Sequence, residues 1–279
     1  MIQDYTYHCH TTFSDGKNSL EEMVARAKEL GFSHMGVSDH LIVHKNIEQS
    51  PSWQILISRS GAHIYKKDFK TALPAYQKHC EEIRELSRRE NFKIYVGFEV
   101  DFFTYDGWLE EFKEFLAQLD YDYVISGNHF LFDEPCETIY NIDKRLSGII
   151  DKPKIQRLIS SHFKTIAKSA ESRMFKFVAH LDYVRKMGTE FCADTDFLSE
   201  KESLVSALKN SVTGTEISTK GLRKVGDFYP NGWFLEKLKE QNIPLVISDD
   251  AHRVEELGFD FDMAEEKLFE LKISNRIKF

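Results

Sequence analysis

The sequence predicts an α/β protein whose parallel strands close into a barrel. Seven short apolar segments alternate with segments of helical periodicity, which is typical of β/α units around a parallel sheet. Residue types that bind metals stand at the carboxyl ends of nearly all these segments. An open, doubly wound sheet would produce the same alternation. Residues from both ends of the chain converge on one point, however, only when the strands surround it, and this favours a barrel with its site at the carboxyl ends.

The first predicted strand, residues 5–13, carries two histidines on one face. Side chains alternate along a strand, so His8 and His10 point the same way while Cys9 points away and is interpreted as a packing residue. Asp15 follows a short turn and can return a carboxylate to the same end of the strand. This stretch therefore predicts part of a metal site.

The next segments complete a strand–helix–strand unit. Ser19 followed by Glu22 has the pattern of a capping box, and apolar residues at helical spacing continue until Gly31. An apolar strand at residues 34–38 then leads to His40.

The alternation continues to the last strand. Further strands are predicted at residues 93–100, 121–126, 175–179, 214–218 and 244–248, and further helices at residues 73–89, 108–119, 154–171, 199–210 and 231–241. Two stretches without clear periodicity, residues 41–75 and 130–152, are expected to be insertions over the strand ends. We expect one barrel domain over residues 1–279, because no repeat or linker indicates a second.

Composition narrows the class of function. The net charge of −8 argues against a nucleic-acid partner, which requires a basic surface. No apolar run approaches the roughly 18 residues of a membrane span, and the first residues lack the pattern of a signal peptide. The four scattered cysteines are typical of free thiols in a reducing cytoplasm. We expect a cytoplasmic protein without a membrane partner, and the sequence leaves its oligomeric state open.

The strand ends together offer six imidazoles and three carboxylates. These residues are His8, His10, Asp15, His40, Glu99, His129, His180, Asp250 and His252. Singly, each could be a packed histidine or a capping carboxylate, but that interpretation requires the same coincidence at almost every strand. The set exceeds the needs of one ion and suits two or three divalent ions such as Zn, Mn or Fe.

The motifs that carry these residues resemble those of the PHP family, named for polymerase and histidinol phosphatase. They are His8-Cys9-His10, Asp15-Gly16, Ser38-Asp39-His40, Gly97-Phe98-Glu99, Gly127-Asn128-His129, Ala179-His180 and Ser248-Asp249-Asp250-Ala251-His252. The resemblance covers the chain from Tyr7 to about Arg253. It implies a distorted seven-stranded (β/α)7 barrel that holds three metal ions.

The resemblance also implies a ligand set for each ion. The first ion would take His8, His10, Glu99 and Asp250. The second would take Glu99, His129 and His180, with Glu99 bridging. The third would take Asp15, His40 and His252. Asp250 is preferred to Asp249 because it lies two residues before the histidine of its motif, while Asp249 faces the opposite way.

Within the family, the chain is most similar to stand-alone histidinol-phosphate phosphatases. The length, the insertion between His40 and Glu99 and the segment 216–223 carry this similarity, although Lys220 stands where a small residue is expected. It implies a hydrolase that converts L-histidinol phosphate to L-histidinol and phosphate in histidine biosynthesis, with a metal-bridged hydroxide as nucleophile and an unassigned general acid. The alternatives are a phosphoesterase for another small phosphomonoester, a nuclease acting on nucleic-acid ends and, least favoured because no ligand is missing, a non-catalytic metal-binding module.

Four residues are candidates for contacting a small phosphorylated substrate. Arg185, Arg223 and Arg253 each follow a strand end and could offer paired donors to phosphate. His44, four residues beyond His40, could face the rest of the substrate.

Overall fold

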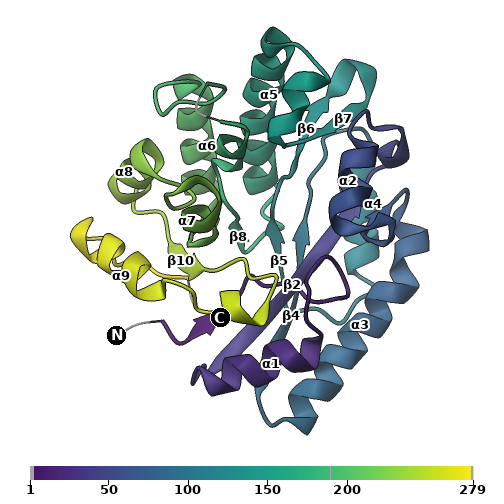
Figure 1. Cartoon of the computed structure of the whole chain (residues 1–279), viewed down its shortest axis with the longest axis vertical. Coiled ribbons are helices and arrows are strands. Elements are labelled where there is room, and N and C mark those ends of the chain that lie inside the picture. Colours follow the sequence, from purple (N-terminus) through teal and green to yellow (C-terminus); the bar gives the residue numbers. More distant parts are fainter. Residues whose placement is uncertain (1–2, 189, 278) are drawn as a thin grey trace.

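A sheet of seven parallel strands organises the computed structural model, which describes residues 3–188, 190–277 and 279 (Figure 1). In spatial order the strands are β1 (Tyr5–Thr6), β2 (His34–Val43), β4 (Lys93–Val100), β5 (Tyr123–Ser126), β8 (Phe177–Val178), β9 (Gly214–Ser218) and β10 (Leu245–Ser248). A further short strand, β3 (Tyr65–Lys66), pairs with the end of β2.

The sheet is nearly closed into a barrel by contacts between its first and last strands. The chain beyond β1 meets the chain beyond β10 through a parallel bridge between Cys9 and Ala251. Before it, the Thr6 hydroxyl donates to Asp249 at 3.0 Å. The Gln3 amide donates to the carbonyl of Ile247 at 2.7 Å. The predicted seven-stranded barrel is therefore confirmed, and these few contacts form the seam of the barrel.

The predicted strand at residues 5–13 is wrong in length, since regular pairing covers only Tyr5–Thr6. Beyond it Cys9 forms only an isolated bridge, with Ala251. Thr11 then donates to the carboxylate of Asp39 through both its backbone N–H and its hydroxyl, each at 2.7 Å, which fixes the turn that follows. Cys9 itself is buried against the carbonyl of Gly36, as predicted for a packing residue.

Helices connect the strands and surround the sheet (Figure 1). They are α1 (Leu20–Glu29), α2 (Trp53–Ser60), α3 (Phe69–Arg89), α4 (Trp108–Leu116), α5 (Lys152–Glu171), α6 (Leu198–Ser211), α7 (Lys220–Val225), α8 (Gly232–Glu240) and α9 (Phe261–Glu270). Single turns of 3-10 helix occur at η1 (Ile47–Gln49), η2 (Ala62–Ile64), η3 (Glu134–Cys136), η4 (Lys144–Gly148), η5 (Tyr183–Met187) and η6 (Val254–Glu256). None of the helices in the described ranges is long and apolar enough to cross a membrane.

The two predicted insertions contain strands that the sequence analysis did not predict. β2 runs past residue 38 to Val43 because it pairs with β4 from His34 to Leu41 and then with β3. The second insertion forms an antiparallel hairpin of β6 (Phe130–Asp133) and β7 (Thr138–Asn141). Ser50 donates to the carbonyl of Ile139 at 2.6 Å, which joins the two insertions at one end of the barrel.

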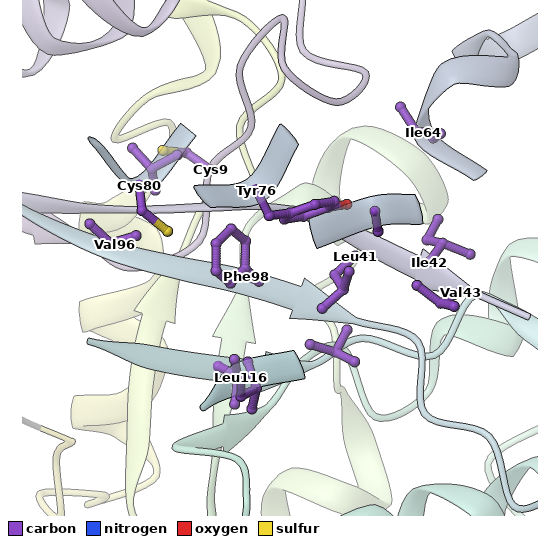
Figure 2. Close-up of a cluster of buried hydrophobic side chains, with 14 of the residues drawn as sticks. Cys9, Leu41, Ile42, Val43, Ile64, Tyr76, Cys80, Val96, Phe98 and Leu116 are labelled. Carbon is purple, nitrogen blue, oxygen red and sulfur yellow. The ribbon is translucent and has the colours of Figure 1, made fainter. Parts of the chain in front are cut away.

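An apolar core between the sheet and helices α3 and α4 holds the site end of the barrel in place. Figure 2 shows Leu41 of β2 and Phe98 of β4 beside Tyr76 and Cys80 of α3. Full burial of an apolar side chain such as Leu41 or Phe98 contributes roughly 1.5–3 kcal/mol to folding. The Tyr76 hydroxyl also donates to the carbonyl of His40 at 2.5 Å, which ties the core to a predicted metal ligand.

Candidate metal centre

A buried carboxylate at the end of β4 lies at the centre of the predicted ligands. Five imidazole nitrogens surround Glu99, which is fully buried. Its Oε1 atom lies 3.3 Å from His8 Nε2, 3.5 Å from His129 Nε2 and 2.9 Å from His180 Nε2. Its Oε2 atom lies 3.3 Å from His10 Nε2 and 3.1 Å from His40 Nδ1. A carboxylate so placed can bridge two cations.

The two aspartates complete the cluster from the turn after β1 and from the end of β10. Asp15 Oδ1 lies 3.3 Å from His40 Nε2 and 3.1 Å from His252 Nε2. Asp250 Oδ1 lies 3.2 Å from His10 Nε2 and 3.4 Å from His252 Nδ1. All nine predicted ligand positions therefore meet in one place.

The donor atoms fit divalent cations in kind and in spacing. Two donors about 2.0–2.1 Å from one tetrahedral ion stand about 3.3–3.4 Å apart, close to the distances found here. Three overlapping groups can each hold an ion: His8, His10, Glu99 and Asp250; His10, Asp15, His40 and His252; and His40, Glu99 and His129. His180 reaches the cluster through Glu99.

Several of these atoms are buried without a hydrogen-bond partner. They include both ring nitrogens of His10, Asp15 Oδ1, Glu99 Oε2 and Asp250 Oδ1. Buried polar atoms are almost always paired, so unpaired ligand atoms that converge on common points indicate a binding site for a cation. The residues present thus fit the divalent metal ions that the sequence predicts.

Protonation in the ion-free protein supports the same conclusion. Burial opposes charge on His8 and His40, yet neighbouring carboxylates, Asp250 for His8 and Asp15 for His40, raise the pKa of each imidazole well above its usual range. Protons thus supply positive charge that the buried carboxylates require, and a divalent ion can replace them. Burial holds the pKa of His129 well below its usual range, so this ligand is already neutral.

Two buried carboxylates that the sequence analysis missed orient the ligands. Glu216 of β9 accepts from the ring of His8 at 2.8 Å and from the backbone N–H of His180 at 3.0 Å. Asp101 lies 3.0 Å from Nδ1 of His129. With Nδ1 engaged, Nε2 of each ring faces the cluster. A carboxylate within a predicted buried strand, such as Glu216, and an acid two residues after Glu99, such as Asp101, are the signals that could have found them.

The backbone also adapts to the cluster at particular positions. A Cβ atom on Gly127 would stand 1.8 Å from Glu99 Oε1, so only glycine leaves room for the central carboxylate. His180 and Asp250 have φ angles of 27° and 45°, which lie in the left-handed region that most residues avoid. Such conformations concentrate at functional sites, where the surrounding structure holds them in place.

The loop that carries Asp15 is anchored by a second buried network. Asp39 accepts from Thr11 and Ser14, and from His79 of α3 at 2.9 Å. Asp15 itself accepts from the hydroxyl of Ser60 at 3.1 Å, so α2 of the first insertion orients this ligand.

A cleft with a volume of about 230 Å³ opens onto the cluster, and cationic side chains predominate among its charged walls. Its lining includes the ligands Asp15, His40, His129 and His252, the cations Lys17, Lys186, Lys220, Lys224 and Arg253, and the aromatic residues Tyr65, Phe130 and Tyr183. Glu256 is the one carboxylate beside the ligands among the described lining residues. The cleft therefore suits an anionic group next to the metal centre.

Of the four residues predicted to contact the substrate, Arg253 lines the cleft and the other three do not. Arg223 instead donates to the carbonyl of Asp249 at 2.9 Å, and Arg185 donates to Asp182 at 3.1 Å. His44 is fully buried among aromatic rings such as Phe103, away from the cleft lining.

Fold and site together define a metal-binding β/α barrel with its ligands at the strand ends. Residues 6–219 match the PHP domain. The chain belongs to the PHP family, and the resemblance of its motifs is thereby confirmed.

Proteins similar to this chain include phosphatases and a polymerase. The chain is 24% identical over 262 residues to a probable histidinol-phosphatase of Deinococcus radiodurans, covering 91% of this chain and 88% of that protein. It is 27% identical over 251 residues to the DNA polymerase/3′-5′ exonuclease PolX of Bacillus subtilis, covering 90% of this chain and 34% of PolX. Its fold is similar to that of the histidinol phosphate phosphatase of Lactococcus lactis subsp. lactis, solved with Zn, L-histidinol and phosphate, with a TM-score of 0.70, 17% identity and coverage of 100% of this chain and 97% of that one.

Proposed function

We propose that this chain is a metal-dependent phosphomonoesterase that hydrolyses L-histidinol phosphate to L-histidinol and phosphate. The observation that carries the proposal is the meeting of nine ligand residues, eight of them in overlapping ion-sized groups, next to a cationic cleft. Histidinol-phosphatases among the relatives, matched over most of their length, support the choice of substrate. Hydrolysis of this ester would place the enzyme in histidine biosynthesis.

The cluster would hold up to three divalent ions, drawn from Zn, Mn and Fe. One ion would take His8, His10, Glu99 and Asp250. Asp15, His40 and His252 would hold another, and Glu99 with His129 and His180 a third. Ions so bound would supply Lewis-acid stabilisation of phosphoryl oxygens and lower the pKa of a water nucleophile.

The residues of the chain would position the substrate for this chemistry. Lys17, Lys186 and Arg253 on the cleft wall attract a dianionic phosphate towards the ligands. Glu256 would place a carboxylate near the ammonium group of histidinol phosphate, while Tyr65 and Tyr183 place aromatic side chains in the lining around its imidazole. The walls of the cleft thus provide groups for both ends of the proposed substrate.

Phosphate release from a panel of esters tests the proposal. The protein, reconstituted separately with Zn, Mn and Fe, is given histidinol phosphate, glycerol 3-phosphate and a 3′-phosphorylated oligonucleotide. We expect kcat/KM for histidinol phosphate to exceed the others by at least about tenfold, which corresponds to about 1.4 kcal/mol of transition-state discrimination. Equal rates on all three would refute the specific substrate, and no release from any would refute the phosphomonoesterase.

A matched pair of variants tests the site independently of the substrate. Asp250→Asn removes a ligand charge at the cluster, and we expect it to abolish most activity and to lower the metal content. Asp262→Asn makes the same chemical change on the exposed face of α9 and should retain both. Wild-type metal content and turnover in Asp250→Asn would refute the ligand assignment.

The relationship to PolX supports a second candidate, an exonuclease acting on nucleic-acid ends. An unphosphorylated single strand labelled at its 5′ end distinguishes this reaction, since shortening of the strand would reveal diesterase activity. The net charge of −8 disfavours it, because a nucleic-acid strand that extends beyond the small cationic cleft also needs a basic surface around it.

A further inference from the structure

Lys220 is a nearly buried cation at the mouth of the metal centre. It is the first residue of α7, directly after β9, and its side chain is only 12% exposed. Its Nζ atom lies 2.7 Å from Asp250 Oδ2, because neighbouring strands β9 and β10 bring the two strand ends together. Its side chain also lines the cleft. The residue therefore contacts a proposed metal ligand and faces the substrate space at once.

The two oxygens of Asp250 face different partners. Oδ1 lies towards the imidazoles of His8 and His10, where a cation would sit, whereas Oδ2 lies towards Lys220. The ion pair thus leaves the ligand oxygen available. An ammonium group has three N–H donors, and Asp250 is the only ion-pair partner that the described residues give Lys220. Two donors are therefore available to an anion in the cleft.

We propose that Lys220 binds a terminal oxygen of the phosphoryl group, both in the substrate and in the phosphate product. Asp250 holds the ammonium group in place, and the side chain is only 12% exposed, so little flexibility is lost when the anion binds. This proposal rests on the proposed phosphomonoesterase function. It assigns a substrate contact to a residue that the sequence analysis noted only as a departure from the family pattern.

The alternative is that Lys220 serves only to orient Asp250 for the metal. The two roles predict different losses. A phosphate-binding lysine affects the affinity for inorganic phosphate while the metal content stays unchanged. A residue that only orients the ligand affects metal content, and phosphate affinity falls only in proportion to the lost metal.

Lys220→Met and Lys220→Arg test the proposal, with Lys237→Met as control. Lys237 on α8 forms an ion pair of the same length with Glu240, 2.7 Å, but on an exposed surface. Binding of inorganic phosphate to each metal-loaded protein is measured by calorimetry, together with metal content and the kinetics of histidinol phosphate hydrolysis.

We expect Lys220→Met to bind phosphate about 10- to 100-fold more weakly and to raise KM more than it lowers kcat, with metal content unchanged. Lys220→Arg, which keeps the charge, should recover most of the affinity, and Lys237→Met should match the wild type. Unchanged phosphate affinity in Lys220→Met, or a loss that follows metal content, would overturn the proposal. If Lys220→Met does not fold, Lys220→Gln replaces it under the same criteria.

Phosphate binding and phosphate release distinguish a failure of the role proposed for Lys220 from a failure of the proposed substrate. A wild-type protein that binds phosphate but releases none from histidinol phosphate would refute the substrate, while the lysine variants would still test Lys220. A wild-type, metal-loaded protein without measurable phosphate binding would refute the role of Lys220.

Discussion

Gly127→Ala should disable the metal centre by one methyl group. The added Cβ would stand 1.8 Å from Glu99 Oε1 and 2.4 Å from its carboxyl carbon. Ordinary contact begins near 3.4 Å, so the central carboxylate must move by about 1.6 Å or the end of β5 must shift. Because Gly127 does not have a positive φ, alanine introduces no backbone strain of its own.

The expected loss follows from that displacement. A misplacement of about 1 Å in a catalytic constellation costs on the order of 100-fold in rate, and overpacking of a buried site costs about 1–3 kcal/mol of stability. We therefore expect at least about 100-fold lower kcat/KM, with reduced metal content and a folded chain.

The assays are phosphate release, elemental analysis of bound metal and thermal unfolding. Gly148→Ala is the matched control, because a Cβ atom there meets nothing within 4 Å. A Gly127→Ala protein with wild-type metal content and rate would refute the central role assigned to Glu99.

Three further predictions concern the supporting residues. In Glu216→Gln the side chain keeps one acceptor oxygen, so it can accept from the His8 ring or from the backbone N–H of His180 but not from both. We therefore expect metal affinity, measured by competition with a chelating dye, to fall about 10- to 100-fold. An unchanged affinity would contradict the orienting role of Glu216. Removal of metal with a chelator should lower the melting temperature by about 5–10 °C, because the ions bind only the folded chain, and added ion should restore it. Identical melting curves with and without metal would contradict binding of ions to the folded chain. Asp39→Asn should cost about 2–4 kcal/mol at pH 7 in chemical denaturation. Burial opposes ionisation of Asp39, but the hydrogen bond and charge of His79 outweigh it and hold the pKa of the carboxyl below its usual range. Its stabilisation is therefore present above about pH 4 and is lost as the pH falls further, so the variant and the wild type should converge in acid; a gap that widens in acid would contradict this assignment.

The ligand residues were predictable because strand ends are marked in the sequence. Short apolar runs end directly before Glu99 and a few residues before His129 and Asp250, and parallel strands bring their ends to one rim. The residues that orient the ligands were not predictable in this way. Glu216, for example, lies inside a strand, and its role depends on the neighbouring strand.

The errors in the predicted elements also have local causes. β2 extends beyond residue 38 because its partners β4 and β3 continue there, and partners are not visible in the strand itself. The six residues of α7 are too few to show a helical period. The contribution of Lys220 depends on its distance from Asp250, which lies on another strand.

The seam between β1 and β10 should open less often when metal is bound. Thr6 and Asp249, which meet there, are 243 positions apart, so their contact closes a very long loop with few backbone hydrogen bonds to hold it. His8 and His10 stand on one side of this junction and Asp250 on the other. An ion shared among them would fasten the first and last strands together. The amide of His10, which donates across the junction to Ala251, would then exchange its hydrogen slowly in the loaded protein and faster in the ion-free protein.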